Sequence, residues 1–136
     1  MEATKVRGVR GAITASDAGM SAVAEATREL LAALIESNDI DLEDLAAAIF
    51  TLPEELAGAN PALVARSVGF QEVPLLMVRE HLGTVDVPRV IRVLLLWNTV
   101  RPRSEIRHVY LHVAAVLRPD LAGHSYQEPE EGGTRW

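Results

Sequence analysis

The sequence predicts one α+β domain, built from a mixed β-sheet with helices on one face. Three observations lead to this class. Residues 90–98 (VIRVLLLWN) are an apolar run with a single cation, Arg92, inside it, as in a strand that is buried on both faces. Residues 21–37 repeat apolar side chains every three or four positions, as an amphipathic helix does. A chain of 136 residues is long enough for one domain with one core.

The first strand is predicted at residues 6–15, VRGVRGAITA, where β-branched residues recur. Gly8 and Gly11 weaken a strand interior and often mark a close approach by another backbone or a ligand. Arg7 and Arg10 lie three residues apart, so their side chains point to opposite faces of the sheet. Only one of these two arginines can therefore serve a given site.

The helix at residues 21–37 is expected to cover one face of the sheet. Asp41 can cap a short turn over residues 42–44, and the apolar run at residues 46–52 is predicted to be a strand in its later part. The helix would turn one apolar stripe toward the sheet, made of Val23, Ala26, Leu30, Leu31, Leu34 and Ile35.

A short helix and another strand follow. Asn60 before Pro61 is typical of a helix start, and Gly69 of its end. The strand is predicted at residues 72–79. Its alternation places Pro74, Leu76, Val78 and Glu80 on one face and Leu75, Met77 and Arg79 on the other.

Arg92 needs a negative partner, because burying a guanidinium costs several kcal/mol unless an anion meets it in good hydrogen-bonding geometry. The partner is either an internal carboxylate or a bound anionic ligand. Glu80, at the end of an otherwise apolar strand, is a reasonable internal candidate.

The end of the chain is predicted to hold one more strand, at residues 108–112 (HVYLH). On a strand, His108 and His112 would lie about 13 Å apart, at roughly 3.3 Å per residue, too far to share one metal ion. Residues 122–136 are polar and rich in Gly, Pro and Glu, so we expect a mobile tail after a single domain at residues 1–121.

Composition argues against several classes of function. The net charge of −6 and the dispersed arginines disfavour a nucleic-acid-binding surface. The chain has no cysteine, which fits the reducing cytoplasm, and no apolar run that predicts a signal peptide or a membrane span. Motifs of metal sites and of nucleophilic serines are missing from the sequence. The predicted strands offer arginines, one carboxylate and one tyrosine, groups that bind and stabilise charge.

Six segments carry a family resemblance: RGVRGAIT, NPALVAR, VPLLMVRE, VIRVLLLWNT, IRHVYL and VLRPDL. In order and spacing they resemble the monofunctional chorismate mutases of the trimeric class with a barrel-like α/β core, not the all-helical class. The resemblance covers residues 6–121, and IRHVYL with LRPD is its most specific part. It implies the rearrangement of chorismate to prephenate in aromatic amino-acid biosynthesis, a pericyclic step without metal, cofactor or nucleophile.

The resemblance also implies roles for four residues. Arg92 would face the ether oxygen of the bond that breaks, where a fixed cation stabilises the transition state more than the ground state. Arg10 would face the enolpyruvyl side chain, with the Tyr110 hydroxyl on the same carboxylate. Glu80 would accept a hydrogen bond from the ring hydroxyl. Tyr110 could instead be only a core aromatic residue.

Further residues are implied at the mouth of the pocket. Arg66 is similar to a mobile arginine of the family, although a solvated surface cation is the alternative. Leu117 and Arg118 are similar to a segment that closes over the ligand, but Arg118 could equally hold the chain turn at Pro119.

Two positions depart from the family pattern. Asn60 stands where an aromatic residue is usual, and Met77 where a small polar residue commonly helps Glu80 to orient the hydroxyl. A thioether is a poor hydrogen-bond acceptor and no donor. We therefore expect an active enzyme with a modified pocket mouth, in which affinity suffers more than the chemical step.

The resemblance finally implies a homotrimer with sites between subunits, in which residues 60–77 of one subunit face the Arg10, Glu80, Arg92 and Tyr110 set of the next. The predicted helices are few, so a monomer would leave one apolar sheet face uncovered. The alternative is a non-catalytic trimer that binds a carboxylated metabolite. That site would need the cations but not Glu80, which favours the enzyme.

Overall fold

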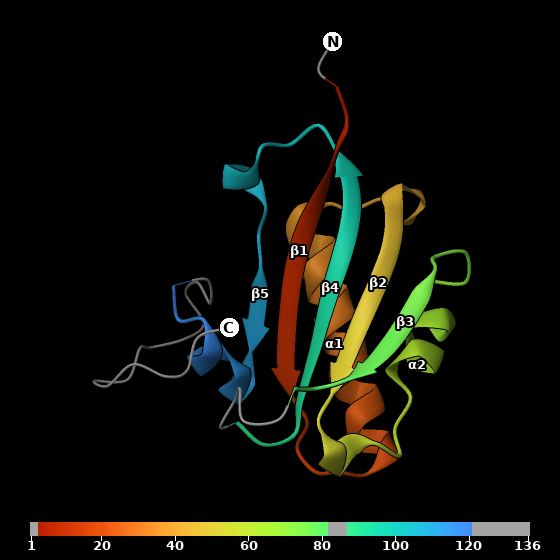
Figure 1. The fold of residues 1–136 in the computed structure, drawn as a ribbon, viewed down its shortest axis with the longest axis vertical. Coiled ribbons are helices and arrows are strands. Elements are labelled where there is room, and N and C mark those ends of the chain that lie inside the picture. The colour runs from red at the N-terminus through yellow and green to blue at the C-terminus, as the bar shows by residue number, and fades with distance from the viewer. Residues whose placement is uncertain (1–2, 82–86, 121–136) are drawn as a thin grey trace.

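A five-stranded mixed sheet with the order β3-β2-β4-β1-β5 forms the centre of the molecule (Figure 1). The structure, a computed structural model, describes residues 3–81 and 87–120, so the predicted tail at residues 122–136 lies outside the described residues. β4 lies in the middle and is antiparallel to β1 and β2, each of which has a parallel edge strand, β5 and β3 respectively. The strand bounds are Lys5–Thr14 (β1), Leu45–Leu52 (β2), Leu75–Arg79 (β3), Val90–Thr99 (β4) and Val109–Leu111 (β5).

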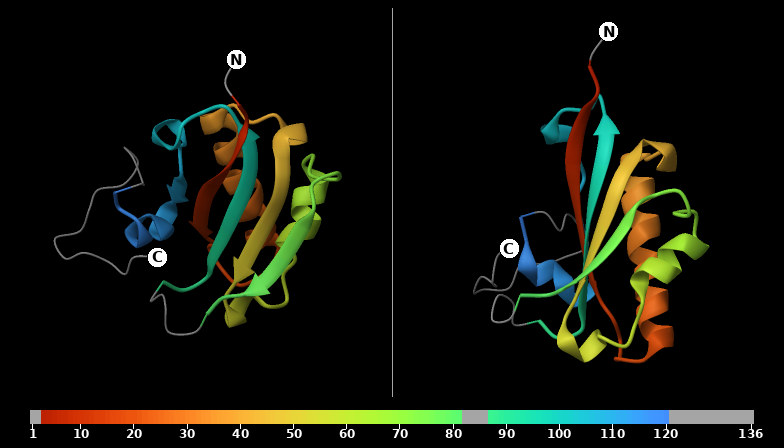
Figure 2. Two further views of the ribbon diagram at one scale, coloured as in Figure 1. Left: turned by 45° about the horizontal axis from the view of Figure 1, so that its top comes forward. Right: turned by 45° about the vertical axis from the view of Figure 1, so that its right-hand side comes forward.

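Two helices, α1 (Met20–Asn38) and α2 (Pro61–Ser67), cover the same face of the sheet (Figure 2). Among the described residues, no helix combines the length and apolar character that a membrane span needs. Short 3-10 turns connect the other elements: η1 (Leu42–Asp44), η2 (Glu54–Leu56), η3 (Arg103–Glu105) and η4 (His112–Leu117). The right-hand view of Figure 2 shows η4 on the side of the sheet opposite α1.

The main core lies between α1 and the sheet. The predicted stripe on α1 is buried from Val23 to Leu34, whereas Ile35 is only half-buried. Asn38, at the end of the helix, is fully buried and bonds to both backbone groups of Arg107. Its Nδ2 donates to the carbonyl at 2.9 Å, and its Oδ1 accepts from the amide at 2.8 Å. Asn38 thereby ties the end of α1 to the segment that enters β5.

Two predicted helix caps are confirmed. Asn60 Oδ1 accepts a hydrogen bond from the Leu63 amide at 3.0 Å, and Asp41 Oδ1 accepts one from the Glu43 amide at 3.0 Å. Gly69 follows the end of α2 with φ of +113°, a backbone conformation that suits glycine.

Two predicted strands are shorter in the structure. β3 starts at Leu75 rather than at residue 72, because Pro74 has no amide to donate to a neighbouring strand. The prediction of a strand through His112 was wrong: β5 ends at Leu111, and His112 has φ of +55° at the start of η4. The pairing with β1 also stops there, since β5 pairs only with Gly11, Ala12 and Ile13.

The sheet face opposite α1 is named here the open face. Strand alternation and exposure place Val6, Leu76, Val78 and Leu94 on it, and their side chains are between 36% and 56% exposed. Four large apolar side chains on one sheet face are more than a monomer usually leaves uncovered. The open face is therefore uncovered in part: these four side chains are exposed, while η4 packs on it at Ala12 and Tyr110.

The packing of α1 on β1 leaves no room for a side chain at position 11, so we expect it to require glycine there. A Cβ at Gly11 would lie 2.6 Å from Leu34 Cδ1, whereas a Cβ at Gly8 would lie 3.4 Å from Leu94 Cδ1, an ordinary contact. We expect Gly11→Ala to lower the free energy of unfolding by about 1–3 kcal/mol, as overpacking does. The matched Gly8→Ala should change it by less than about 0.5 kcal/mol. Urea unfolding measures both, and equal effects would contradict this account.

Candidate active site

The strand register places four side chains in one row across the open face. Ala12 of β1 pairs with Arg92 of β4 on one side and with Tyr110 of β5 on the other. Arg92 in turn pairs with Thr51 of β2. Directly paired residues project to the same face of a sheet. Only the methyl group of Ala12 separates Tyr110 from Arg92, and these two side chains interact electrostatically.

Arg92 forms an ion pair with Glu80, as predicted. Its Nε lies 2.9 Å from Glu80 Oε1, and the two side chains are only 4% and 11% exposed. Glu80 is held in place by its backbone amide, which donates to the Leu52 carbonyl at 2.8 Å and extends the pairing of β3 with β2 by one residue. Of the two partners that the sequence left open for Arg92, the structure contains the internal carboxylate.

Burial dominates the titration of this pair. Desolvation raises the pKa of Glu80, and the charge of Arg92 and a hydrogen bond from Thr51 oppose that shift. Desolvation likewise lowers the pKa of Arg92 against the opposing charge of Glu80. Both directions mean that the attraction does not fully repay the loss of hydration. The attraction thus offsets part of the cost of burial, and the contact fixes the direction of the guanidinium.

Tyr110 belongs both to the row and to a small core. It is 1% exposed and packs in a cluster with Ala12, Val90, Ala114 and Leu117, so it is also the core aromatic that the alternative interpretation described. Burial raises the pKa of its hydroxyl. The hydroxyl is therefore neutral near pH 7 and can donate a hydrogen bond.

The segment after β5 packs against the row at Leu117 and is held in a turn by Arg118. Leu117 is fully buried in the Tyr110 cluster, which places the end of η4 against the row. Arg118 contacts Asp120 through Nε at 3.1 Å and Nη2 at 2.9 Å, and this pairing raises the pKa of Arg118. Arg118 thus holds the turn around Pro119, as the alternative for this residue proposed.

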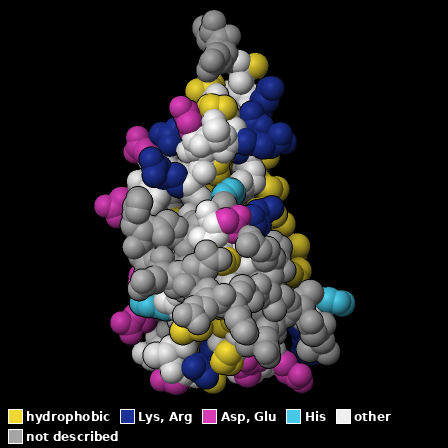
Figure 3. Space-filling model, turned by 90° about the vertical axis from the view of Figure 1, so that its left-hand side faces the viewer, with side chains coloured by type: hydrophobic (Ala, Val, Ile, Leu, Met, Phe, Trp, Pro, Cys, Tyr) yellow, Lys and Arg dark blue, Asp and Glu magenta, His cyan; other side chains and the backbone are white. Residues whose placement is uncertain are grey.

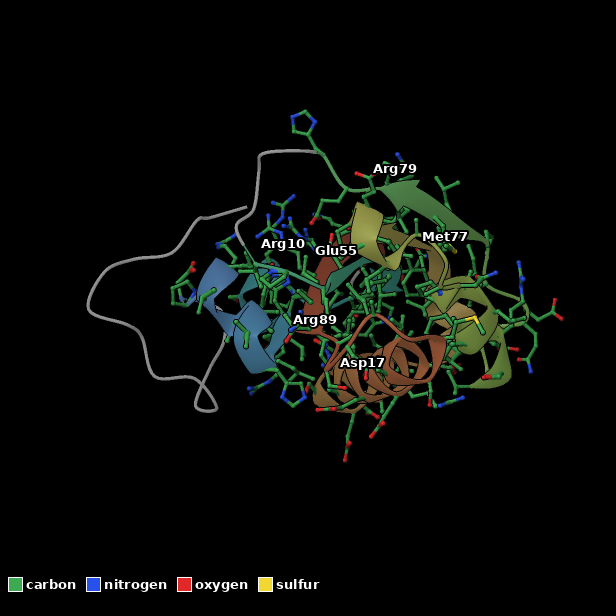
Figure 4. The ribbon with its side chains drawn as sticks, turned by 90° about the horizontal axis from the view of Figure 1, so that it is seen from below. Arg10, Asp17, Glu55, Met77, Arg79 and Arg89 are labelled. Atoms are coloured by element: carbon green, nitrogen blue, oxygen red, sulfur yellow. The ribbon has the colours of Figure 1, made fainter. Side chains whose placement is uncertain are left out.

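Arg10 lies on the open face two residues before Ala12, half-buried (Figure 4). Its backbone amide donates to His108 Nδ1 at 2.9 Å. Strand alternation assigns Arg7 to the opposite face, and its Nε donates to the Arg101 carbonyl at 3.2 Å. Of these two arginines, Arg10 is therefore the one that lies on the same sheet face as Arg92.

Three residues expected near the pocket are not brought to the row within one chain. Asn60, the N-cap of α2, and Arg66 within α2 are exposed, and this helix lies on the helix-covered face. Met77 lies on the face of β3 opposite Glu80, packed against the main core, and Figure 4 shows it toward α2 and away from Arg10. Within one chain, Met77 therefore does not stand beside Glu80.

Thr51 is a site residue that the sequence analysis missed. Its hydroxyl donates to Glu80 Oε1 at 3.4 Å, while its strand neighbour in β4 is Arg92. The only local signal is a single polar residue in the apolar run at residues 46–52. Its meaning appears only once β2 is known to lie between β3 and β4.

The described part of the chain, residues 3–81 and 87–120, contains no group of three His, Asp or Glu side chains that could hold a metal ion. The row, together with Arg10 and Glu80 beside it, instead offers two cations, a neutral hydroxyl and a carboxylate. Such a set can bind anionic groups and form hydrogen bonds of defined direction.

Comparisons with known proteins agree with this geometry. The family model for chorismate mutase type I matches residues 6–121. A chorismate mutase AroH from Thermus thermophilus is 53% identical over 117 residues, covering 85% of this chain and 96% of the relative. Its counterpart from Bacillus subtilis (strain 168) is 35% identical over 118 residues, covering 86% and 93%.

A solved structure is also similar. The chorismate mutase from Clostridium thermocellum superimposes with a TM-score of 0.75 at 35% identity, covering 82% of this chain and all of the other. The five-stranded mixed sheet is thus similar to the fold of a solved chorismate mutase. This chain belongs to the chorismate mutase type I family.

Proposed function

We propose that Arg92, Arg10, Glu80 and Tyr110 carry the activity of this type I chorismate mutase. The enzyme is an isomerase that converts chorismate to prephenate in aromatic amino-acid biosynthesis. The observation that supports these roles best is the buried ion pair that directs Arg92 within a row shared with Tyr110. The relatives are named as enzymes, which favours catalysis over a binding protein on the same scaffold. A cytoplasmic location stays a prediction from the sequence.

Arg92 acts on the bond that breaks. Breaking the ether bond of chorismate leaves partial negative charge on its oxygen. A guanidinium that is already oriented and desolvated stabilises this charge without reorganising during the reaction. Glu80 supplies the orientation through its 2.9 Å contact with Nε. Arg92 thereby lowers the energy of the transition state more than that of the bound substrate.

Arg10 and Tyr110 hold the substrate in its reactive shape. Chorismate is a dianion, and only its folded form can rearrange. The Arg10 guanidinium and the neutral Tyr110 hydroxyl bind the side-chain carboxylate and keep the reacting ends together. Glu80 contacts Arg92 and Thr51 through the same oxygen, Oε1. Since a carboxylate has about four acceptor positions, Glu80 can also accept the ring hydroxyl.

A homotrimer completes the site. The open face exposes Leu76, Val78 and Leu94, and a neighbouring subunit covers them. Asn60 and Arg66 then reach the row from that neighbour, which accounts for their distance from it within one chain. β3 is an edge strand, so the exposed part of Met77 is accessible to the same interface. The end of η4, with Leu117 and Arg118, forms the wall that closes over the substrate.

Arg92→Lys should lose most of the activity and keep the fold. An ammonium cannot reproduce both the contact with Glu80 and a hydrogen bond to the ether oxygen. We expect kcat to fall at least about a hundredfold, the loss typical of removing one oriented donor. The measurement is the ultraviolet signal of chorismate without added metal or cofactor. The control is Arg79→Lys, an exposed arginine on the other face of β3. Near-normal turnover by a folded Arg92→Lys variant would contradict the role of Arg92.

Asn60→Phe should restore an aromatic wall at the pocket mouth and lower KM about threefold, as an added aromatic contact does. It also removes the cap on α2, which should cost about 1 kcal/mol of stability. Asn60→Ala loses the same cap without adding a ring, so the difference between the two variants isolates the ring. If their KM values are equal, the pocket does not lack an aromatic wall.

Leu76→Glu should disrupt the trimer and the activity together. Leu76 is 56% exposed on the open face, and a carboxylate there would be buried in the interface. Light scattering should give three subunit masses for the unmodified protein and one for the variant. Met20→Glu is the control, since Met20 is 73% exposed on α1 and away from the open face. A monomeric unmodified protein, or a trimeric Leu76→Glu variant, would refute the assembly.

A further inference from the structure

We propose that His108 is a positioning residue for Arg10, and that it works only as a neutral imidazole. The proposal rests on the role of Arg10 in the proposed function and extends it. His108 itself touches no reacting group. Its ring fixes the backbone of the strand that carries Arg10 at the point where that strand loses its neighbour.

The geometry of β1 shows why such a contact is needed. β5 pairs with β1 only along Gly11, Ala12 and Ile13. Just before this stretch, the Arg10 amide points to the β5 side and donates to His108 Nδ1 at 2.9 Å. The imidazole thus takes the place of a strand carbonyl. Without it, a half-buried amide next to the site would lack this acceptor, which costs free energy and loosens the strand.

The hydrogen bond fixes the tautomer of His108. A nitrogen that accepts a hydrogen bond carries no proton, so in the neutral ring the proton is on Nε2. Protonation of Nδ1 would place two N–H donors face to face and put a second positive charge beside Arg10. Both changes displace the Arg10 backbone, and a displacement of about 1 Å can cost up to about a hundredfold in rate.

The surroundings of His108 favour the neutral form. Its ring lines a hollow of about 270 Å³ together with Arg7 and Arg10 of β1 and Arg103 of η3. Burial lowers the pKa of His108, and the charges of Arg10 and Arg118 lower it further, while Asp120 opposes them. Figure 3 shows several Lys and Arg side chains, with some Asp and Glu side chains among them, over the upper part of this edge of the molecule. A protonated His108 would therefore join a group of cations.

Glu80 must be separated from His108 in any test, because both lose their working form as the pH falls. Burial raises the pKa of Glu80, so its carboxylate is protonated at a higher pH than that of an ordinary glutamate. The acid side of the pH profile of kcat/KM should thus contain a step from each residue. Only the His108 step disappears when residue 108 cannot titrate.

The decisive variant is His108→Asn. Asparagine Oδ1 is the same number of bonds from Cα as Nδ1, so it can accept the Arg10 amide, and it does not titrate. We expect kcat/KM at pH 8 to remain within about twofold of the unmodified enzyme, and the acid side of its pH profile to lose the step that belongs to His108. His108→Leu removes the acceptor and should lower kcat/KM at pH 8 about tenfold. His112→Asn is the matched control, because His112 is exposed, contacts Glu29 and has a φ of +55° that asparagine tolerates.

The outcomes separate this proposal from the role of Arg10. If His108→Asn has the pH profile of the unmodified enzyme, or His108→Leu has its kcat/KM at pH 8, the proposal is wrong. If Arg10→Ala also keeps full activity, the role of Arg10 is wrong as well. If Arg10→Ala is inactive, the role of Arg10 holds, but His108 is not needed to position it. Should His108→Leu fail to fold, 15N nuclear magnetic resonance of the unmodified enzyme still decides, since a protonated Nδ1 at pH 7 would refute the tautomer.

Discussion

The ion pair between Arg92 and Glu80 is the constraint on which the rest of the structure depends. It joins β4 to the end of β3, although β2 lies between these strands. Neighbouring strands are about 4.8 Å apart, so the pair bridges roughly 10 Å of sheet. Only a long side chain can span that distance, and the residue beneath must be small. Thr51 meets the second condition and adds a hydrogen bond to the same carboxylate oxygen. The pair therefore links three neighbouring strands, β3, β2 and β4, through side chains on one face.

Much of the fold could be predicted because its signals are local. The stripe on α1, the caps at Asp41 and Asn60 and the alternation of β3 each depend on residues a few positions apart. The role of Thr51 could not be predicted, because it depends on which strands are neighbours. The end of β5 was misplaced for the same reason: His112 leaves the strand where pairing with β1 stops, and its own side chain does not signal this.

Part of the site was also predicted from the sequence, on energetic grounds and not from a local pattern. Glu80 as the partner of Arg92 followed from the cost of a buried guanidinium, and the structure confirms it. The place of Met77 did not follow from its family position. Alternation puts it on the face opposite Glu80, and the structure agrees with alternation. At Asn60, the amide that replaces an aromatic residue caps α2. That position serves helix stability in this chain, whatever it does for the substrate.

The strand directions have a consequence for how this enzyme can change. β1, β2, β3 and β5 all run opposite to β4, so their carboxyl ends meet the beginning of β4 at one end of the sheet. Ala12, Thr51, Glu80 and Tyr110 lie at or next to those ends, and the connections that leave them start there. Connections tolerate changes in length and composition better than paired strands do. Substitutions in these connections should therefore alter the surroundings of the row, while the strand register keeps its charged side chains in place.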